Sequence, residues 1–313
     1  MPSSSRPPKK RRHHHVWQYH LKAWASDSGQ VWVRHRGGAP YPNSPINVAV
    51  ERDFYRHRPL SPDESAFARR LVETMNPPFK KHALEWIDLL SVGHGAAQAF
   101  ERGDLDEEDH ADVDVGLNNV VENLHEQVEQ GVLPVLDRLR QGDLSVADDP
   151  EAWTQLCIYL GTQYMRTTSK QAALTDSFSD LDPARFDPQA MVGALRIVLG
   201  FTFAQNLAFR REATDVRLVH AEGESTFITG DQPVVNTQAV HAPAGVEPEA
   251  LTLFFPVGPS LGLQLECDSG EGIRESASLG SLGVQTLNGM MAAEAERQLV
   301  GASKANLAAV PFD

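Results

Sequence analysis

Apolar residues recur three and four positions apart across the middle of the chain, which is the pattern of amphipathic helices. A first helix is expected to begin after Ser61, because Ser61 can cap it, Pro62 suits its first position and Glu64 can complete a capping box. This helix is expected to end before Pro77. Four further helices are predicted over about residues 79–92, 112–139, 150–171 and 187–212.

The two flanking zones instead have the alternating segments and turn residues that are typical of β-strands. Near the start, Trp17, Leu21 and Trp24 fit one face of a short helix, and residues 30–34 alternate as a strand. Later strands are predicted over residues 215–220, 225–229, 250–255 and 261–266. The last two are expected to form a hairpin, and a final helix is expected at about residues 278–299.

These zones predict an α+β fold, in which a helical block lies between N- and C-terminal strand elements. Both groups of strands need a sheet to bury their apolar faces, so we expect them to share one small, mainly antiparallel sheet. Residues 13–313 are predicted to form a single domain, with the helical subregion at about 61–212. Residues 1–12 are predicted to be a disordered basic tail.

The net charge of -14 is distributed unevenly along the 313 residues. Residues 1–58 hold 11 Lys/Arg against 3 Asp/Glu, whereas the remainder holds 17 against 39. The basic run Lys9–Arg12 could contact nucleic-acid phosphates or act as a sorting address, although such runs are more often solvated tails. The acidic remainder argues against nonspecific duplex binding as the main activity.

The composition also bears on the expected cellular location of the protein. No apolar run is expected to approach the roughly 20 residues that cross a bilayer, so we predict no membrane partner. The first residues lack the apolar segment of a secretory signal. The two cysteines, Cys157 and Cys267, lie far apart and predict a reduced, cytoplasmic protein without a disulfide framework.

Asp231 follows the apolar strand Phe227–Thr229, in the turn Gly230–Pro233. An acid at a strand end is held by a rigid sheet while its carboxylate faces a loop, which is a common position for catalytic acids. The alternative is that Asp231 caps the turn through local backbone hydrogen bonds.

Five segments, in order along nearly the whole chain, resemble the bacterial and fungal "domain of unknown function 4238" family. Its members have a His-His-x-Val-Pro-x-x-Tyr-Leu-x-x-Phe start, a central Arg-Thr segment, a late Ser-Asp-x-Pro turn, a Phe-Pro-Leu-Ser-Pro hairpin and a terminal Asn. The matching segments here are His13–Leu21 with Trp24, Gln163–Thr167, Thr229–Pro233, Phe255–Pro259 and Leu287–Asn288. Trp17, His20 and Gly230 stand where the family pattern has Pro, Tyr and Ser. The family name implies no reaction.

The chemistry must therefore be argued from residue types. A His and an Asp can form an acid–base pair, or can bind a divalent metal together with a further ligand, so a metal is a candidate cofactor. An Arg binds phosphate or carboxylate with its planar fork, and an Asn can bond an amide, a base edge or an oxyanion. The candidate catalytic residues are His14 and Asp231, and the candidate substrate-binding residues are Arg166, Asn288, Gln163 and Glu51.

Each of these residues also has a structural alternative. His14 could flank the first helix without a further role, and Arg166 could pair with a structural carboxylate. Asn288 could bridge the last helix to a neighbouring element. These alternatives and the functional interpretation stay open on the sequence alone.

Two hypotheses about function remain, because the chain lacks a P-loop, a dinucleotide fingerprint, a Gly-x-Ser-x-Gly elbow and a His-Glu-x-x-His helix. The first is a hydrolase of an anionic, phosphate-containing substrate, such as a metal-assisted nuclease or phosphodiesterase. The alternative is a noncatalytic ligand-sensing or interaction module in stress response or mobile-element defence. The expected partner is a small anionic ligand or nucleic acid. We favour the hydrolase slightly, because a buried His/Arg/Asp/Asn set is costly without a charged ligand.

Overall fold

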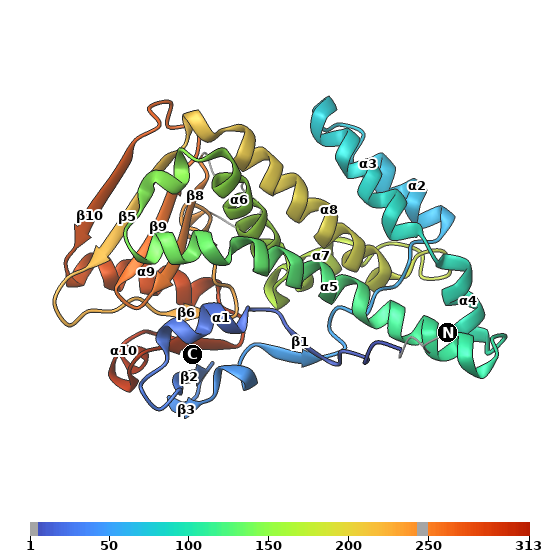
Figure 1. Cartoon of the computed structure of the whole chain (residues 1–313), viewed down its shortest axis with the longest axis horizontal. Coiled ribbons are helices and arrows are strands. Elements are labelled where there is room, and N and C mark those ends of the chain that lie inside the picture. Colours follow the sequence, from blue (N-terminus) through green and yellow to red (C-terminus); the bar gives the residue numbers. More distant parts are fainter. Residues whose placement is uncertain (1–5, 243–249) are drawn as a thin grey trace, which may run out of the picture.

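The computed structural model describes residues 6–242 and 250–313 and has the predicted α+β fold. A central block of helices lies between N-terminal and C-terminal strands along the chain (Figure 1). The helices of the block are α2 (Pro62–Leu71), α3 (Pro77–Ser91), α4 (His94–Arg102), α5 (Glu107–Arg140), α6 (Pro150–Met165), α7 (Thr168–Ser177) and α8 (Pro188–Phe209).

The start of the helical block follows from its capping residues. Ser61 and Glu64 form the expected capping box, in which the Ser61 side chain accepts from the backbone of Glu64 and the Glu64 side chain accepts from that of Ser61. Asp106 caps α5, which therefore begins at Glu107, before the predicted start at about residue 112. The expected helix over 150–171 is broken at Arg166, which is the C-cap of α6.

α8 corrects the prediction that no segment is apolar enough to cross a membrane. Its 22 residues meet that criterion by length and composition, with a mean hydropathy of 1.4 over an 18-residue window. Half of that window is buried inside the protein, which is how the core helix of a folded domain passes the same test. Gly161 of α6 lies so close to α8 that a Cβ there would meet the carbonyl oxygen of Gly200 at 2.6 Å.

The strands form three sheets rather than one. N- and C-terminal strands do share the four-stranded sheet, which has the order β3-β2-β11-β6 and antiparallel pairing throughout. Its strands are β2 (Val31–His35), β3 (Tyr41–Asn43), β6 (Thr229–Gly230) and β11 (Gln298–Gly301). A two-stranded sheet pairs β1 (Arg12–His14) with β4 (Val50–Arg52).

The remaining C-terminal strands form a separate five-stranded sheet with the order β10-β5-β9-β8-β7. Its strands are β5 (Asp215–Ala221), β7 (Val235–Asn236), β8 (Thr252–Gly258), β9 (Leu261–Glu266) and β10 (Arg274–Leu279). The predicted hairpin is β8–β9, and every residue of β8 is buried. Both faces of this sheet are covered by helices. α5 and α6 pack on one face, and α9 (Ser281–Glu294) packs on the other, so this sheet forms a layer separate from the four-stranded sheet. The remaining helices are α1 (Gln18–Leu21) and α10 (Lys304–Ala308).

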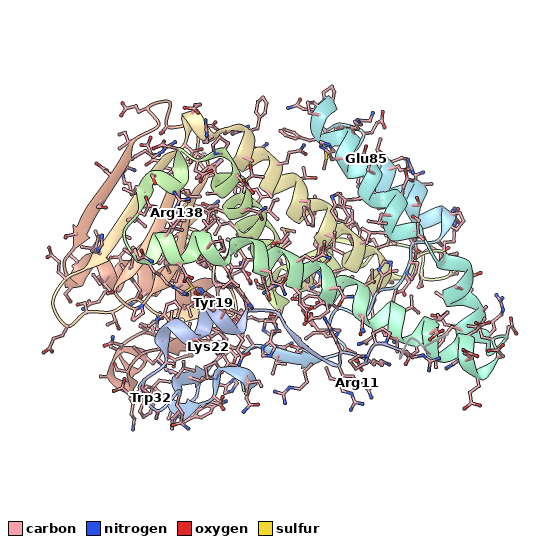
Figure 2. The ribbon with its side chains drawn as sticks, in the orientation of Figure 1. Arg11, Tyr19, Lys22, Trp32, Glu85 and Arg138 are labelled. Atoms are coloured by element: carbon pink, nitrogen blue, oxygen red, sulfur yellow. The ribbon has the colours of Figure 1, made fainter. Side chains whose placement is uncertain are left out.

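Part of the segment that the sequence predicts to be a disordered basic tail, residues 9–11, contacts the rest of the protein. Lys9 forms an ion pair with Asp114 of α5 at 2.7 Å. The backbone N–H of Lys10 donates to the Asn119 side chain at 2.8 Å, and Arg11, labelled in Figure 2, pairs with Asp53 at 3.0 Å. These partners are distant in sequence, so the local composition could not reveal them. Residues 1–5 lie outside the described part, and nucleic acid as a partner stays a prediction.

Candidate functional site

The carboxylate of Asp231 binds the backbone that connects α9 to β11. Its Oδ1 accepts from the N–H of Glu296 at 2.8 Å, and its Oδ2 accepts from those of Arg297 and Gln298 at 2.7 and 3.1 Å. Burial raises the pKa of Asp231, whereas these three donors oppose that shift. The side chain thus holds a distant turn in place, and neither the turn-capping alternative nor an acid–base pair with His14 describes these contacts.

Asn288 likewise has both ends of its amide occupied. Its Oδ1 accepts from the N–H of Ile228 at 3.0 Å, and its Nδ2 donates to the carbonyl oxygen of Thr226 at 2.9 Å. The side chain therefore bridges α9 to the segment before β6, as the structural alternative for this residue proposes.

Arg166 and Gln163 meet the N-terminal segment at the end of α6. The Nε2 of Gln163 and the Nε of Arg166 both donate to the carbonyl oxygen of His15, at 2.9 and 3.2 Å. The other end of the Arg166 guanidinium forms an ion pair with Glu129 of α5 at 2.7 Å, and both side chains are largely buried. Arg166 thus has the structural carboxylate partner that the sequence left open as an alternative.

The contacts of these candidate residues form two groups, one around Asp231 and one around His14, Gln163 and Arg166, and Glu51 lies beside both. Glu51 pairs with the side chain of Arg297 at 2.6 Å, and the backbone of Arg297 binds Asp231. Glu51 is thereby linked to Asp231, and it also lies opposite His13 where β4 pairs with β1, beside His14. His14 immediately precedes the residue that binds Gln163 and Arg166. Among the described residues, no hydrogen bond or ion pair joins Asp231 to His14 or to Arg166.

Several buried polar atoms of the second group lack a hydrogen-bond partner in the described part of the chain. Neither ring nitrogen of His15 has one, although His15 is only 3% exposed. Nδ1 of His14, Oε1 of Gln163, Oγ1 of Thr168 and Nε of Arg196 also lack a hydrogen-bond partner among the described residues, and Nη2 of Arg166 has only its ion pair with Glu129. Burial lowers the pKa of His14 to about 4 and that of His15 to about 3, so both rings are neutral near neutral pH.

Arg196 is the residue that the sequence analysis missed. It is 8% exposed and is the one charged residue of α8. Its Nη1 donates to the Gln171 side chain at 2.9 Å, and its guanidinium lies 4.9 Å from the ring centre of Phe54. Within residues 6–242 and 250–313, no carboxylate forms an ion pair with it. A single charge in an otherwise apolar helix was the signal that could have identified it.

A cavity of about 350 Å³ lies at Arg196, and we call it the Arg196 pocket. Its size is that of a small-molecule site. Three arginines line it, of which Arg56 pairs with Asp114 at 2.8 Å and Arg58 with Asp187 at 2.9 Å. Its walls are Asp53, Phe54, Tyr55, Arg56, His57, Arg58, Val121, Gln171, Gln189, Val192, Gly193 and Arg196. Oδ2 of the wall residue Asp53 pairs with Arg11, whereas its buried Oδ1 has no hydrogen-bond partner in the described residues. Of the three arginines of this pocket, Arg196 is the one that forms no ion pair within the described part of the chain.

Behind this pocket lies a void of about 20 Å³, bordered by Tyr55, His125, Arg166 and Arg196. It has room for a single water molecule but for no substrate. The predicted Arg166 therefore lies one layer behind the Arg196 pocket and supports it, because the carbonyl oxygen of Arg166 accepts from Arg196 at 3.4 Å.

The candidate metal has no ligand set in the part of the chain that the structure describes. There, no three His, Cys, Asp or Glu side chains are grouped so that they could hold a metal ion. His14 and Asp231, the predicted ligands, have the separate surroundings given above. Within residues 6–242 and 250–313, His14 and Asp231 therefore do not fit a divalent-metal site that needs a third His, Cys, Asp or Glu ligand.

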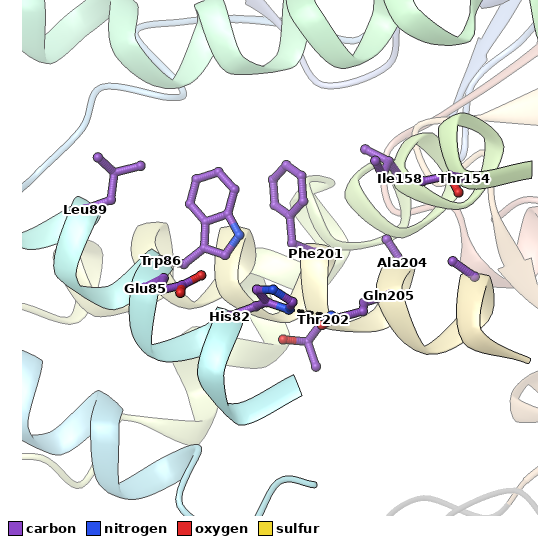
Figure 3. Close-up of a pocket in the computed structure, with 11 residues that line it drawn as sticks. His82, Glu85, Trp86, Leu89, Thr154, Ile158, Phe201, Thr202, Ala204 and Gln205 are labelled. Atoms are coloured by element: carbon purple, nitrogen blue, oxygen red, sulfur yellow. Dashed lines mark hydrogen bonds between the residues drawn. The ribbon is translucent and has the colours of Figure 1, made fainter. Parts of the chain in front are cut away.

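Another cavity, of about 440 Å³, lies between α3, α6 and α8 (Figure 3). Trp86 and Phe201 stack there with ring centres 4.4 Å apart. Most of its lining surface is apolar; its polar members are His82 and Gln205, which bond to each other, the carboxylate Glu85, and Thr154 and Thr202. It therefore offers mainly apolar contact surface, with Glu85 as its one charged wall residue in the described part of the chain.

The fold and these cavities define an α+β protein with a basic, ligand-sized pocket where the N-terminal segment meets the helical block. Over residues 12–305 the chain matches the family described as "Protein of unknown function (DUF4238)", and it belongs to that family. No curated protein and no solved structure matches it.

Proposed function

We propose that this protein binds a small anion, a phosphate or carboxylate group, in the Arg196 pocket, and that it senses or carries this ligand rather than hydrolysing it. The observation that carries the proposal is the buried guanidinium of Arg196, which has no carboxylate partner among the described residues. A buried charge without a counterion is costly, and an anionic ligand would offset that cost.

The surroundings of Arg196 support this proposal. Arg56 and Arg58 add positive charge to the same walls, and Gln171 and Gln189 add amide groups that can donate to an anion. The unpartnered Nε of Arg196 leaves a donor for planar, two-point recognition of a phosphate or carboxylate.

Three observations favour binding over hydrolysis. The carboxylate of Asp231 is used by three backbone donors, and Asn288 by two backbone groups. His14 and His15 are poor general bases near neutral pH, because an effective base has a pKa close to the working pH.

A cytoplasmic location remains part of the proposal and is consistent with Cys157 and Cys267, which are buried as free thiols.

The test compares Arg196→Met with Arg102→Met, a surface control whose arginine pairs with Asp104. Inorganic phosphate is titrated into each folded protein by calorimetry. Loss of charge-assisted hydrogen bonds should weaken binding by about tenfold or more in Arg196→Met, and the control should match the wild type. Equal affinity in all three proteins, or no binding to the wild type, would refute the proposal.

A second measurement addresses the hydrolase hypothesis directly. The wild type is incubated with bis(4-nitrophenyl) phosphate, with and without Mg²⁺ or Mn²⁺, and released nitrophenol is measured. We expect no turnover. Turnover that fell about 100-fold in folded Asp231→Asn would restore the hydrolase and the catalytic role of Asp231.

A further inference from the structure

An apolar groove of about 710 Å³ lies beside the Arg196 pocket, between α3, α4, α5 and α8. Of its apolar side chains, Leu89, Val92 and Val120 are 58%, 67% and 51% exposed. α3, α4 and the first part of α5 lie on the side of the molecule away from the five-stranded sheet, whereas the C-terminal part of α5 packs on that sheet (Figure 1). His57, Gly116 and Val121 also line the groove.

The groove and the Arg196 pocket share two wall residues, His57 and Val121. Burial lowers the pKa of His57 to about 4, so its ring is neutral near neutral pH. The groove lining contains no Asp, Glu, Lys or Arg, whereas the Arg196 pocket has three arginines. Apolar and positively charged surfaces therefore adjoin at His57 and Val121.

We propose that the ligand is an amphipathic anion, with a phosphate or carboxylate head at Arg196 and an alkyl or acyl chain in the apolar groove. This inference rests on the proposed function, because it assigns the head to the Arg196 pocket. Exposed apolar surface that no other element covers is stabilised by an alkyl chain, since each buried methylene adds favourable transfer free energy. The uncharged lining of the groove suits an alkyl chain. Attraction between the anionic head and Arg196 determines which end of the ligand lies in the Arg196 pocket.

The experiment compares dodecyl phosphate, below its micelle concentration, with inorganic phosphate on the full chain. If the groove takes the chain, dodecyl phosphate binds at least about tenfold more tightly, because several methylene groups leave water. Dodecyltrimethylammonium, with the same chain and the opposite charge, should bind at least about tenfold more weakly than dodecyl phosphate.

A variant that fills the groove tests the contribution of the alkyl chain to binding separately from that of the anionic head. Gly116 lines the groove, and a Cβ built there meets nothing within 4 Å, so Gly116→Leu adds volume without a local clash. The affinity for dodecyl phosphate should fall about tenfold, whereas that for inorganic phosphate should not change. Gly95→Leu is the matched control, because Gly95 is also helical and open but lies outside the groove lining.

The outcomes distinguish the two proposals. Equal affinities for dodecyl phosphate and inorganic phosphate would overturn the amphipathic ligand but leave anion binding intact. Failure of both to bind would remove both proposals. Equal binding of the ammonium compound would show that the chain alone directs binding, and would overturn the head assignment. A wild-type dimer that Gly116→Leu dissociates, with unchanged dodecyl phosphate affinity, would assign the groove to a second copy of the chain.

Discussion

The polar interior around Asp231 and that around Arg196 differ in how fully their hydrogen bonds are met. The two carboxylate oxygens of Asp231 accept three backbone N–H groups, and Asn288 uses both its oxygen and its nitrogen. At Arg196 and His15, by contrast, buried nitrogen atoms have no partner among the described residues.

This difference separates residues that hold the fold from residues that are available to a ligand. Groups whose bonding capacity is used by the backbone contribute to stability and have little left for a substrate. Buried polar groups that lack partners reduce stability, and such groups concentrate at functional sites. Variants that alter stability and binding separately therefore test the comparison.

The largest loss of stability is expected at the ion pair that supports the Arg196 pocket. Glu129→Gln leaves the buried guanidinium of Arg166 without its counterion, which should reduce the free energy of unfolding by about 3–5 kcal/mol. The measurement is urea denaturation followed by circular dichroism. Glu126→Gln, one turn earlier on α5 and nearly half exposed, should change stability by less than about 1 kcal/mol.

A double variant identifies the cause of this loss. Glu129→Gln combined with Arg166→Met should recover much of the stability, because it also removes the unpaired charge. If Glu129→Gln alone were as stable as the wild type, Arg166 would have another counterion, and the pair would not support the site.

A smaller loss is expected at Asp231. Asp231→Asn keeps the size of the side chain but replaces one acceptor oxygen by an amide that faces backbone donors, at a cost of about 2–3 kcal/mol. Its affinity for inorganic phosphate should equal that of the wild type. The control is Asp27→Asn, a change at an exposed residue. If Asp231→Asn had the stability of the wild type but bound phosphate differently, the roles assigned to the two regions would be reversed.

The sequence predicted most helices because their signals are local. Periodic apolar residues and the Ser61 capping box were sufficient for α2, α3, α5 and α8. The final helix, expected to reach residue 299, instead ends at Glu294, because Asp231 binds the backbone that follows and β11 pairs with β2 and β6. That contact joins residues more than sixty positions apart, and local periodicity carries no information about it.

The site was less predictable for the same reason. Arg166 and Gln163 were identified and do lie at the junction behind the pocket, whereas Asp231 and Asn288 have backbone partners elsewhere. Residue type alone could not distinguish structural from functional residues, since an aspartate that binds three backbone N–H groups and a catalytic aspartate are the same amino acid in the sequence. The lone charge of Arg196 in an apolar helix was visible, but its lack of a partner is a property of the folded chain.

The smallest change in stability is expected at Arg196, although this residue carries the proposed function. Arg196→Met removes a buried charge that has no carboxylate partner in the described part of the chain, and methionine can occupy much of the same apolar surface. Loss of the contact with Phe54 and of the hydrogen bonds to Gln171 and to the carbonyl oxygen of Arg166 opposes this gain, so the free energy of unfolding should stay within about 1 kcal/mol of the wild type. Urea denaturation without phosphate provides the measurement. A loss above about 2 kcal/mol would make Arg196 a structural residue like Arg166. Retained stability together with weakened phosphate binding would instead place it among the groups that the fold holds for a ligand.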